Sequence, residues 1–283
     1  MKGKTVLIVG GILLLIGVLI LIIGFALGGT QTTDQFEMKQ FEATKPVSRL
    51  DITGNVGKLV VRFSEEAEFV SVEYPTAKNT RTDVSVQGDT FAFSGINAPW
   101  WDFFGWRKFS NVPDTVITLP RGRYSASLRV NAGKMEFPSG TYGDVTIKVS
   151  AGSFEGGELL CESLGCEVNA GSCTVQGADC STYEGRVSAG ALRMETLCCD
   201  SCDVRVSAGD FRAEKLLCPD IRTKISAGDV YLRVVGKKEE YDVTAKRSAG
   251  SIVGVEEQRV AGAEKFMNFS VSAGKIVVEF AAS

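Results

Sequence analysis

The 283-residue chain contains no histidine, only seven prolines and no large excess of either charge. Without histidine it cannot build a Ser-His-Asp or Cys-His nucleophile system, an HExxH metalloprotease site, or a histidine-ligated zinc or haem centre. Lysine and arginine total 31 against 34 aspartates and glutamates, so the formal net charge is −3. Nucleic-acid-binding proteins carry a basic footprint that this balance does not supply. We therefore expect no nucleic-acid partner, and we expect no cofactor.

Glycine is abundant where proline is scarce. The chain has 31 glycines in 283 residues, about 11 %, against a usual share of roughly 7 %. The small number of prolines excludes a collagen-like chain and a proline-rich linker as the source of this excess. Regular turns are the remaining explanation.

A long uncharged segment lies near the N-terminus. Residues 5–29 carry no charge, and the only charged residues before them are Lys2 and Lys4. About 20 apolar residues span a bilayer as a helix, whereas the apolar region of a cleaved signal peptide, the alternative, has about 7 to 15. The segment predicts one transmembrane α-helix after a cytoplasmic tail at 1–4. A juxtamembrane linker at 30–46 and an extracytoplasmic remainder would follow, which makes the expected location the cell membrane, as a single-pass protein.

A small-residue motif, Ser or Asn followed by Ala and Gly, recurs at a nearly constant interval through the second half of the chain. The first five intervals between its glycines are equal, as from Gly133 to Gly152, and the last two are longer, which indicates insertions in the final repeats. We expect these glycines to form corners, where the chain needs a positive φ or a close approach of two backbones. They are Gly133, Gly152, Gly171, Gly190, Gly209, Gly228, Gly250 and Gly274.

Apolar and polar residues alternate within each repeat, as in a strand with one buried face. Val130 and its counterparts form one apolar column and the motif alanines another, while the motif Ser and Asn form a polar column. We interpret the polar column as a hydrogen-bond ladder; a flat polar face for ice or glycan is the alternative. No repeat has the spacing of an amphipathic helix, which excludes a helical or leucine-rich repeat. The predicted fold is all-β: a single-domain parallel β-solenoid of about 19 residues per coil, preceded by the transmembrane helix.

All eight cysteines lie in the repeats. Cys161, Cys180, Cys199 and Cys218 occupy the same position of four successive repeats and are predicted to stack inward, which leaves Cys198 as the most exposed thiol. Buried free cysteine behaves as a small hydrophobe. Neighbouring coils also bring Cα atoms within the roughly 4.4 to 6.8 Å that a disulfide needs, so both interpretations stay open. A zinc site is disfavoured because no second CxxC pair has zinc-ribbon spacing.

Residues 47–129 alternate like strands and are predicted to form an N-terminal β region and cap, ahead of regular repeats at 130–283. The sequence around Gly57 echoes that around Gly133, so an imperfect first coil is expected to begin near residue 48. An aromatic insertion at 98–111 either covers the open end of the core or forms an exposed interaction patch. Its aromatic residues are Trp100, Trp101, Phe103, Phe104, Trp106 and Phe109.

The segments FEATKPVSRLDITGNVGKLVV and TVITLPRGRYSASLRVNAG, with the recurrent VSAG, resemble a bacterial putative-adhesin domain family of unknown function and of β-helix type. The resemblance covers residues 36–283. It implies an envelope protein, often with an N-terminal membrane anchor, and it supplies no ligand and no catalytic residues. The cysteine column and the two lengthened terminal coils depart from the family pattern.

The expected function is that of a non-catalytic, adhesin-like binding or structural module of the bacterial cell envelope. Its expected partners are the membrane, through the anchor, and a cell-wall glycan or an envelope protein. One alternative is an envelope-stress sensing or regulatory protein, which would need a further partner because its cytoplasmic tail is so short. The other is a polysaccharide-active β-helix enzyme, for which Asp210 with Asp229 and Arg193 with Arg212 are candidate outward pairs on adjacent coils.

Overall fold

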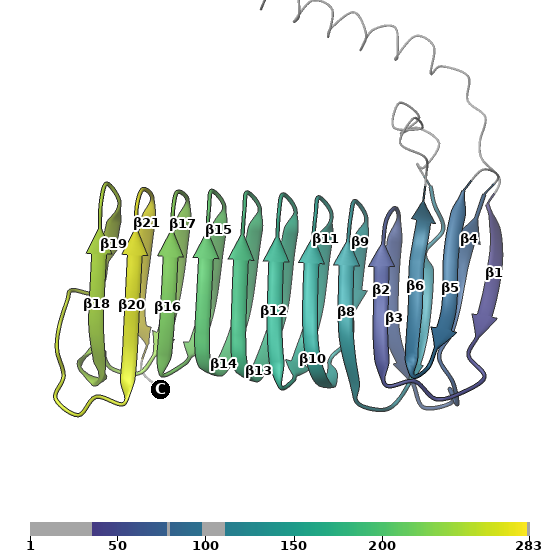
Figure 1. The fold of residues 1–283 in the computed structure, drawn as a ribbon, viewed down its shortest axis with the longest axis horizontal. Helices are drawn as coiled ribbons and strands as arrows, with labels where there is room; N and C mark the ends of the chain where they lie inside the picture. Colours follow the sequence, from purple (N-terminus) through teal and green to yellow (C-terminus); the bar gives the residue numbers. More distant parts are fainter. Residues whose placement is uncertain (1–35, 78–79, 98–110, 282–283) are drawn as a thin grey trace, which may run out of the picture.

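The computed structural model describes residues 36–77, 80–97 and 111–281. In this part of the chain, 21 strands form one continuous sheet that coils into a solenoid with two long faces (Figure 1). Each regular coil crosses one face, turns at the small-residue motif, crosses the other face and turns again, so that equivalent residues of successive repeats become strand partners. This parallel β-solenoid is consistent with the architecture expected from the repeat.

The strands of each face lie side by side along the solenoid axis. On the first face the order is β5 (Arg81–Gln87), β6 (Thr90–Asn97), β2 (Arg49–Gly54), β8 (Tyr124–Val130), β10 (Gly140–Val149), β12 (Ser163–Val168), the second halves of β13 (Ser172–Val187) and β14 (Ala191–Val206), β16 (Asp220–Ile225), β20 (Lys265–Val271) and β18 (Tyr241–Arg247). On the second face it is β1 (Glu37–Glu42), β4 (Ser71–Thr76), β7 (Thr115–Pro120), β3 (Lys58–Ser64), β9 (Lys134–Phe137), β11 (Ser153–Leu160), the first halves of β13 and β14, β15 (Asp210–Leu217), β17 (Asp229–Val235), β21 (Lys275–Ala281) and β19 (Ser251–Val253). A short 3-10 turn, η2, spans Lys238–Glu240.

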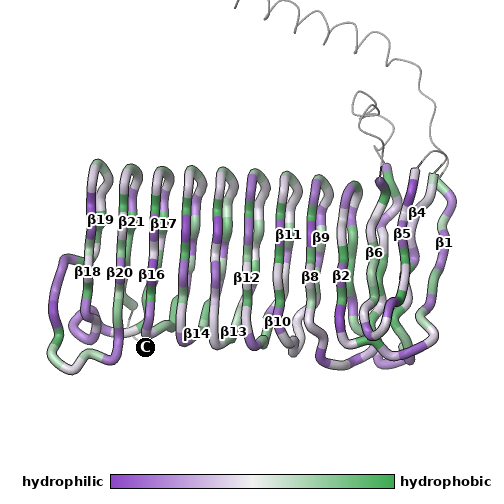
Figure 2. The backbone as a smooth tube through the Cα atoms, in the orientation of Figure 1, coloured by the Kyte–Doolittle hydropathy of each residue, from purple (hydrophilic) through white to green (hydrophobic). Residues whose placement is uncertain are grey.

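Apolar side chains from the two faces fill the interior. Buried and exposed residues alternate along the strands, and the hydropathy colours alternate with them in Figure 2. Val149, Val168, Val187 and Val206, which occupy the same position of successive repeats, are each at most 2 % exposed. Because each buried residue stacks on its equivalent in the next coil, the core is one column that runs the length of the solenoid.

Backbone hydrogen bonds between coils continue through the glycine corner. The amide of Ser188 donates to the carbonyl of Val168 at 2.8 Å, one coil back. The backbones lie so close there that a Cβ built on Gly190 would be 2.2 Å from the carbonyl oxygen of Gly171. Glycine is therefore required at this corner because the backbones of adjacent coils approach too closely to leave room for a Cβ.

A positive φ explains only part of the glycine column. Gly57, Gly228 and Gly274 have φ values of 80°, 102° and 101°, whereas the remaining corner glycines lie outside the left-handed region.

The motif alanines were expected to point inward, and that expectation is wrong. Each alanine is exposed at the tip of the corner: Ala132, Ala151, Ala170, Ala189, Ala208 and Ala227.

Both ends of the solenoid depart from chain order. The coil formed by β2 and β3 lies between the coil of β6 and β7 and the coil of β8 and β9. At the other end, β20 and β21 lie inside β18 and β19, which form the outermost coil. A Cβ on Gly274 would thus be 2.0 Å from the carbonyl oxygen of Gly228, and one on Gly250 would be 2.7 Å from that of Gly274. The extra residues of the two longer intervals between corner glycines lie in the connections at this end, which include η2 and the segment between β19 and β20.

The segment between β19 and β20 returns the chain around the outermost coil. Within it, Gln258 exchanges two backbone hydrogen bonds with Val243 of β18, at 2.9 and 3.1 Å. The Gln258 side-chain amide also donates to the carbonyls of Lys238 and Tyr241, at 2.8 and 2.7 Å. These contacts cover part of the last strand edge, which would otherwise present unpaired backbone groups.

Two expectations about the N-terminal region are corrected. The expected linker at 30–46 contains β1, which pairs antiparallel with β4. The expected transmembrane helix at 5–29 lies outside the described residues, and no helix within them is long and apolar enough to cross a membrane. The fold class is corrected to an all-β solenoid in the described chain. The single-pass membrane localisation is withdrawn with the helix on which it depended.

The glycine corner gives a direct stability test. We expect Gly190→Ala to lower the free energy of unfolding by about 2 to 4 kcal/mol, because the new Cβ must displace the backbone of the preceding coil. Gly165→Ala is the matched control, since the nearest atom to its Cβ would be Thr146 Oγ1 at 4.0 Å. Denaturant unfolding of both variants measures the difference. Equal effects of the two substitutions would show that close approach at the corner is unimportant.

Candidate functional site

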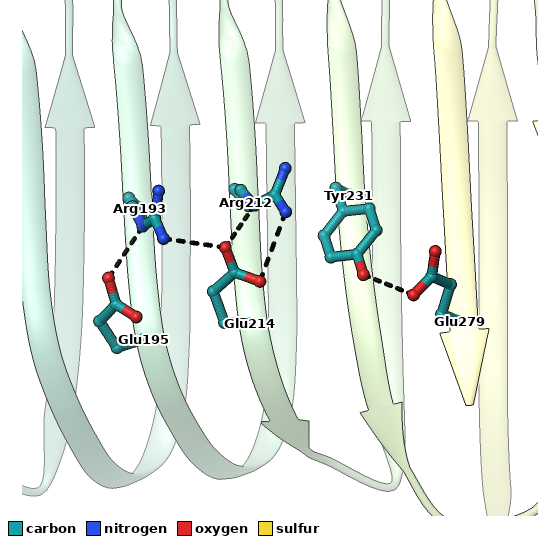
Figure 3. Close-up of polar contacts among 6 residues, drawn as sticks. All are labelled: Arg193, Glu195, Arg212, Glu214, Tyr231 and Glu279. Carbon is teal, nitrogen blue, oxygen red and sulfur yellow. Dashed lines mark hydrogen bonds and ion pairs between the residues drawn. The ribbon is translucent and has the colours of Figure 1, made fainter. Parts of the chain in front are cut away.

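Six polar side chains form a connected row on the outer surface of the second face. They come from β14, β15, β17 and β21, which are neighbours in the sheet (Figure 3). We call this row the ionic array; it consists of Arg193, Glu195, Arg212, Glu214, Tyr231 and Glu279. The array crosses four successive coils, and its members extend from residue 193 to residue 279 of the sequence.

Contacts within the array run without a break from one end to the other. Arg193 Nε lies 2.8 Å from Glu195 Oε1, and an Arg193 terminal nitrogen lies 3.0 Å from Glu214 Oε1. Arg212 donates to both carboxylate oxygens of the same Glu214. Glu214 therefore bridges two arginines on adjacent coils.

The second half of the array is built around an aromatic ring. The guanidinium carbon of Arg212 lies 4.2 Å from the centre of the Tyr231 ring, and the Tyr231 hydroxyl donates to Glu279 at 2.6 Å. Val277 is the strand partner of Tyr231 on the side away from Arg212. A guanidinium thus occupies a face of the ring, so the array offers a ligand mainly hydrogen-bonding groups.

The register of the coils produces this arrangement. Arg193, Arg212 and Tyr231 are successive strand partners, and side chains at equivalent outward positions of neighbouring strands are brought within contact distance. Arg193 and Arg212 would repel each other, but the carboxylate of Glu214 lies between them. The side chains of Arg193 and Arg212 are about half exposed, at 49 % and 48 %, and Glu214 is 23 % exposed, so the array is open to a ligand.

The protonation states of the array suit binding better than proton transfer. The hydrogen bond from Arg212 lowers the pKa of Glu214, and the positive charges of Arg193 and Arg233 lower it further. The same hydrogen bond raises the pKa of Arg212. Hydrogen bonding to Glu279 raises the pKa of Tyr231. A catalytic general acid needs a raised carboxyl pKa, which is the reverse of the shift at Glu214.

The sequence identified only part of this site. It paired Arg193 with Arg212, and these are strand partners; Asp210 and Asp229 are also partners, with both side chains exposed. The ionic partners of the arginines were missed. Glu195 and Glu214 occupy the same position of successive repeats and could have been found from the repeat. Glu279 could not, because it reaches Tyr231 only through the exchanged order of the last coils.

The expected aromatic interaction patch lies outside the described residues. This holds for all six of its aromatic positions: Trp100, Trp101, Phe103, Phe104, Trp106 and Phe109. The choice between a cap and a binding patch for the insertion at 98–111 stays a prediction.

The polar column next to the corner forms only some contacts of the expected ladder. The Asn131 amide donates to Asn55 at 2.6 Å, and the hydroxyls of Ser150 and Ser188 lie 3.4 and 3.3 Å from the asparagine one coil back. A shallow groove of about 580 Å³ follows the adjoining glycine corner. Apart from Lys134, its lining consists of glycine, alanine and serine, which give little chemical specificity.

The cysteine column lies at the opposite corner, between the second face and the first. Cys180, Cys199 and Cys218 are buried, while Cys161 is partly exposed, as is Cys198. A groove of about 520 Å³ runs along this corner. Across residues 36–77, 80–97 and 111–281, no three cysteine, aspartate or glutamate side chains gather in a way that would hold a metal ion.

Comparison with known proteins gives the family and the fold. The Toastrack DUF4097 family model matches residues 47–265. The chain belongs to this family. No curated protein matches the chain. The crystal structure of a putative adhesin from Bacteroides fragilis has 13 % sequence identity, covers 88 % of this chain and 100 % of its own, and superposes with a TM-score of 0.56. A putative adhesin from Parabacteroides distasonis, also 13 % identical, covers 88 % of this chain and 98 % of its own, with a TM-score of 0.50.

The resemblance to an adhesin-like domain of unknown function is confirmed by the family match, whereas the anchor that was expected with it is not supported. The two superpositions show a shared fold, and at 13 % sequence identity they show no more than the fold. Function must therefore be argued from the site on this Toastrack domain.

The ion pairs of the array predict a pH-dependent coupling. A double-mutant cycle of Arg212→Ala and Glu214→Ala should show a favourable interaction between the two side chains at pH 7. Because the folded-state pKa of Glu214 is lowered, this stabilisation is complete above the ordinary glutamate pKa of 4.5 and is lost as the pH falls through the lower folded-state value. Thermal unfolding of the four proteins between pH 7 and pH 3 measures it. A coupling that stays constant over this range would contradict the ion-pair assignment.

Proposed function

We propose that this Toastrack domain is a non-catalytic, adhesin-like binding module that recognises a hydroxyl-rich polymer, with a cell-wall glycan as the first ligand class. The observation that carries the proposal is the ionic array, an exposed and internally connected row of donors and acceptors that crosses four coils. A solenoid holds such groups about 4.8 Å apart from coil to coil, which matches an extended ligand better than a compact one.

Preorganisation makes the array suitable for binding. Arg193 and Arg212 are each held by carboxylates, and Arg212 is also stacked on Tyr231. Side chains fixed in this way lose less conformational freedom when a ligand binds. The guanidinium groups are about half exposed and supply donors, and the carboxylates supply acceptors, so neutral hydroxyl groups can be bound without burial of an unpaired charge.

The relatives support the same class of function. The two solved structures with the shared fold are described as putative adhesins, which are binding proteins by that description. The lowered pKa of Glu214 also favours binding over acid catalysis. An envelope protein is the second ligand class that the proposal includes.

Binding of the purified protein to immobilised cell-wall polysaccharide tests the proposal. We expect Arg212→Ala to weaken binding about tenfold, because it removes the group that joins Glu214 to Tyr231. Arg212→Lys should be impaired as well, since lysine keeps the charge without the planar stack or the paired donors.

Arg205→Ala is the matched control. Arg205 makes an equivalent ion pair with Asp203, at 2.9 Å, on the opposite face of the solenoid. We expect less than a twofold change in binding for this variant. Equal binding by wild type and Arg212→Ala, or equal losses in both variants, would overturn the array as the binding surface. Binding to envelope proteins and not to polysaccharide would retain a binding module and reject the glycan.

A further inference from the structure

We propose that the four cysteines of the thiol corner form two disulfides between adjacent coils, Cys161 with Cys180 and Cys199 with Cys218. The thiol corner is the turn that leads from the second face to the first, and it is defined by these four residues. The four are free thiols in the structure, so the proposal assigns the corner as a site of oxidative modification by a low-molecular-weight disulfide. It is independent of the proposed ligand binding.

The register places the members of each pair on neighbouring coils. Leu160 pairs with Asp179, and Ser163 pairs with Thr182. Cys161 and Cys180 lie between these two pairs at the same register, so they are side by side on adjacent coils. The amide of Cys161 also donates to the carbonyl of Asp179 at 2.9 Å. Neighbouring strands lie about 4.7 to 4.9 Å apart, within the Cα separation of about 4.4 to 6.8 Å found in disulfides.

The second pair is bracketed in the same way. Cys198 pairs with Leu217, and Ser201 pairs with Asp220, so Cys199 lies beside Cys218. These two cysteines are 5 % and 4 % exposed, against the partly exposed Cys161 of the first pair.

Contacts between the thiols select these pairs over the alternative. The thiols of Cys161 and Cys180 lie close enough to perturb each other's pKa, and so do those of Cys199 and Cys218. Cys180 and Cys199 are strand partners, but both lie within strands and their side chains extend in parallel from a fixed ladder. Cys161 and Cys218 directly follow β11 and β15 and have no strand partner of their own, so the sheet restrains them less than it restrains Cys180 and Cys199.

A small disulfide can reach the corner from solvent. The groove of about 520 Å³ is lined by all four cysteines and also by Cys198. By contrast, Cys166, Cys173 and Cys202 are at most 2 % exposed within the core and do not line this groove. Oxidation in the folded protein should therefore be confined to the cysteines that line this groove.

The exchange reaction has a direction at the first pair. The hydrogen bond with Cys180 lowers the pKa of Cys161 and raises that of Cys180. The Cys161 thiolate attacks a sulfur of the small disulfide, which breaks the S–S bond and releases one thiolate. This leaves Cys161 in a mixed disulfide with the other half of the small molecule. The Cys180 thiol then loses its proton to solvent and attacks Cys161 Sγ, which breaks the mixed disulfide, forms the protein disulfide and releases the second thiolate. Two protein thiols are oxidised while one small disulfide is reduced to two thiols.

The second pair should react more slowly. A hydrogen bond with Cys202, together with burial, raises the pKa of Cys199, and a hydrogen bond with Cys199, together with burial, raises that of Cys218. Neither thiol therefore forms a thiolate readily. Two kinetic phases are expected, with the bridge between Cys161 and Cys180 formed first.

Incubation of the folded protein with oxidised glutathione tests the proposal. The reduced chain has eight free thiols, one for each cysteine. The number measured by thiol titration in denaturant should fall to six and then to four. Peptide mapping without reductant should recover the two proposed linkages. The melting temperature of the oxidised protein should exceed that of the reduced protein by on the order of 5 to 10 °C for each one-coil loop that is closed.

Single variants separate the proposed pairs from general oxidation. Cys161→Ser should abolish the fast phase and leave the slow one, whereas Cys198→Ser, which alters another thiol of the same groove, should leave both phases. Eight remaining thiols, a linkage between Cys180 and Cys199, or linkages only between molecules would overturn the proposal. Recovery of a single bridge would overturn the assignment of the other pair.

Discussion

The close stacking of one coil on the next is the interaction on which the rest of the structure depends. Backbone hydrogen bonds join neighbouring coils along both faces and through the glycine corner, as between the amide of Ala189 and the carbonyl of Asn169 at 2.7 Å. Such an approach leaves no room for a side chain at the corner, and a Cβ on Gly171 would lie 2.1 Å from the carbonyl oxygen of Gly152. Glycine at one position of each coil therefore permits a sheet without interruption.

Stacking also determines the chemistry of the surface. Every outward residue has a neighbour in the next coil, so the identity of residues one repeat apart decides whether two coils attract or repel. Glu214 lies between Arg193 and Arg212 and joins them, and Arg212 stacks on Tyr231. The same rule at the other corner brings thiols together. The proposed binding surface and the proposed disulfide site thus both rest on the same repeat, on different sides of one core.

The ends of the solenoid solve a separate problem, because a terminal coil exposes both its core and its strand edges. The last strands of the chain, β20 and β21, lie one coil inward, and the loop through Gln258 covers an edge of the outermost coil. At the other end, β1 and β5 join the sheet by antiparallel pairing. These devices interrupt the parallel stacking that the regular coils would otherwise extend to another chain.

The sequence by itself determined the repeat length, the parallel solenoid, the stacked cysteines and the need for glycine at the corner, because all of these follow from local alternation and a fixed repeat spacing. It did not determine the inward position of β20 and β21, the exposure of the corner alanines, or the contact of Tyr231 with Glu279. These depend on which coil lies beside which. Repeats of nearly equal sequence bury nearly equal surfaces in either order, so only the complete packing of the ends decides between the orders.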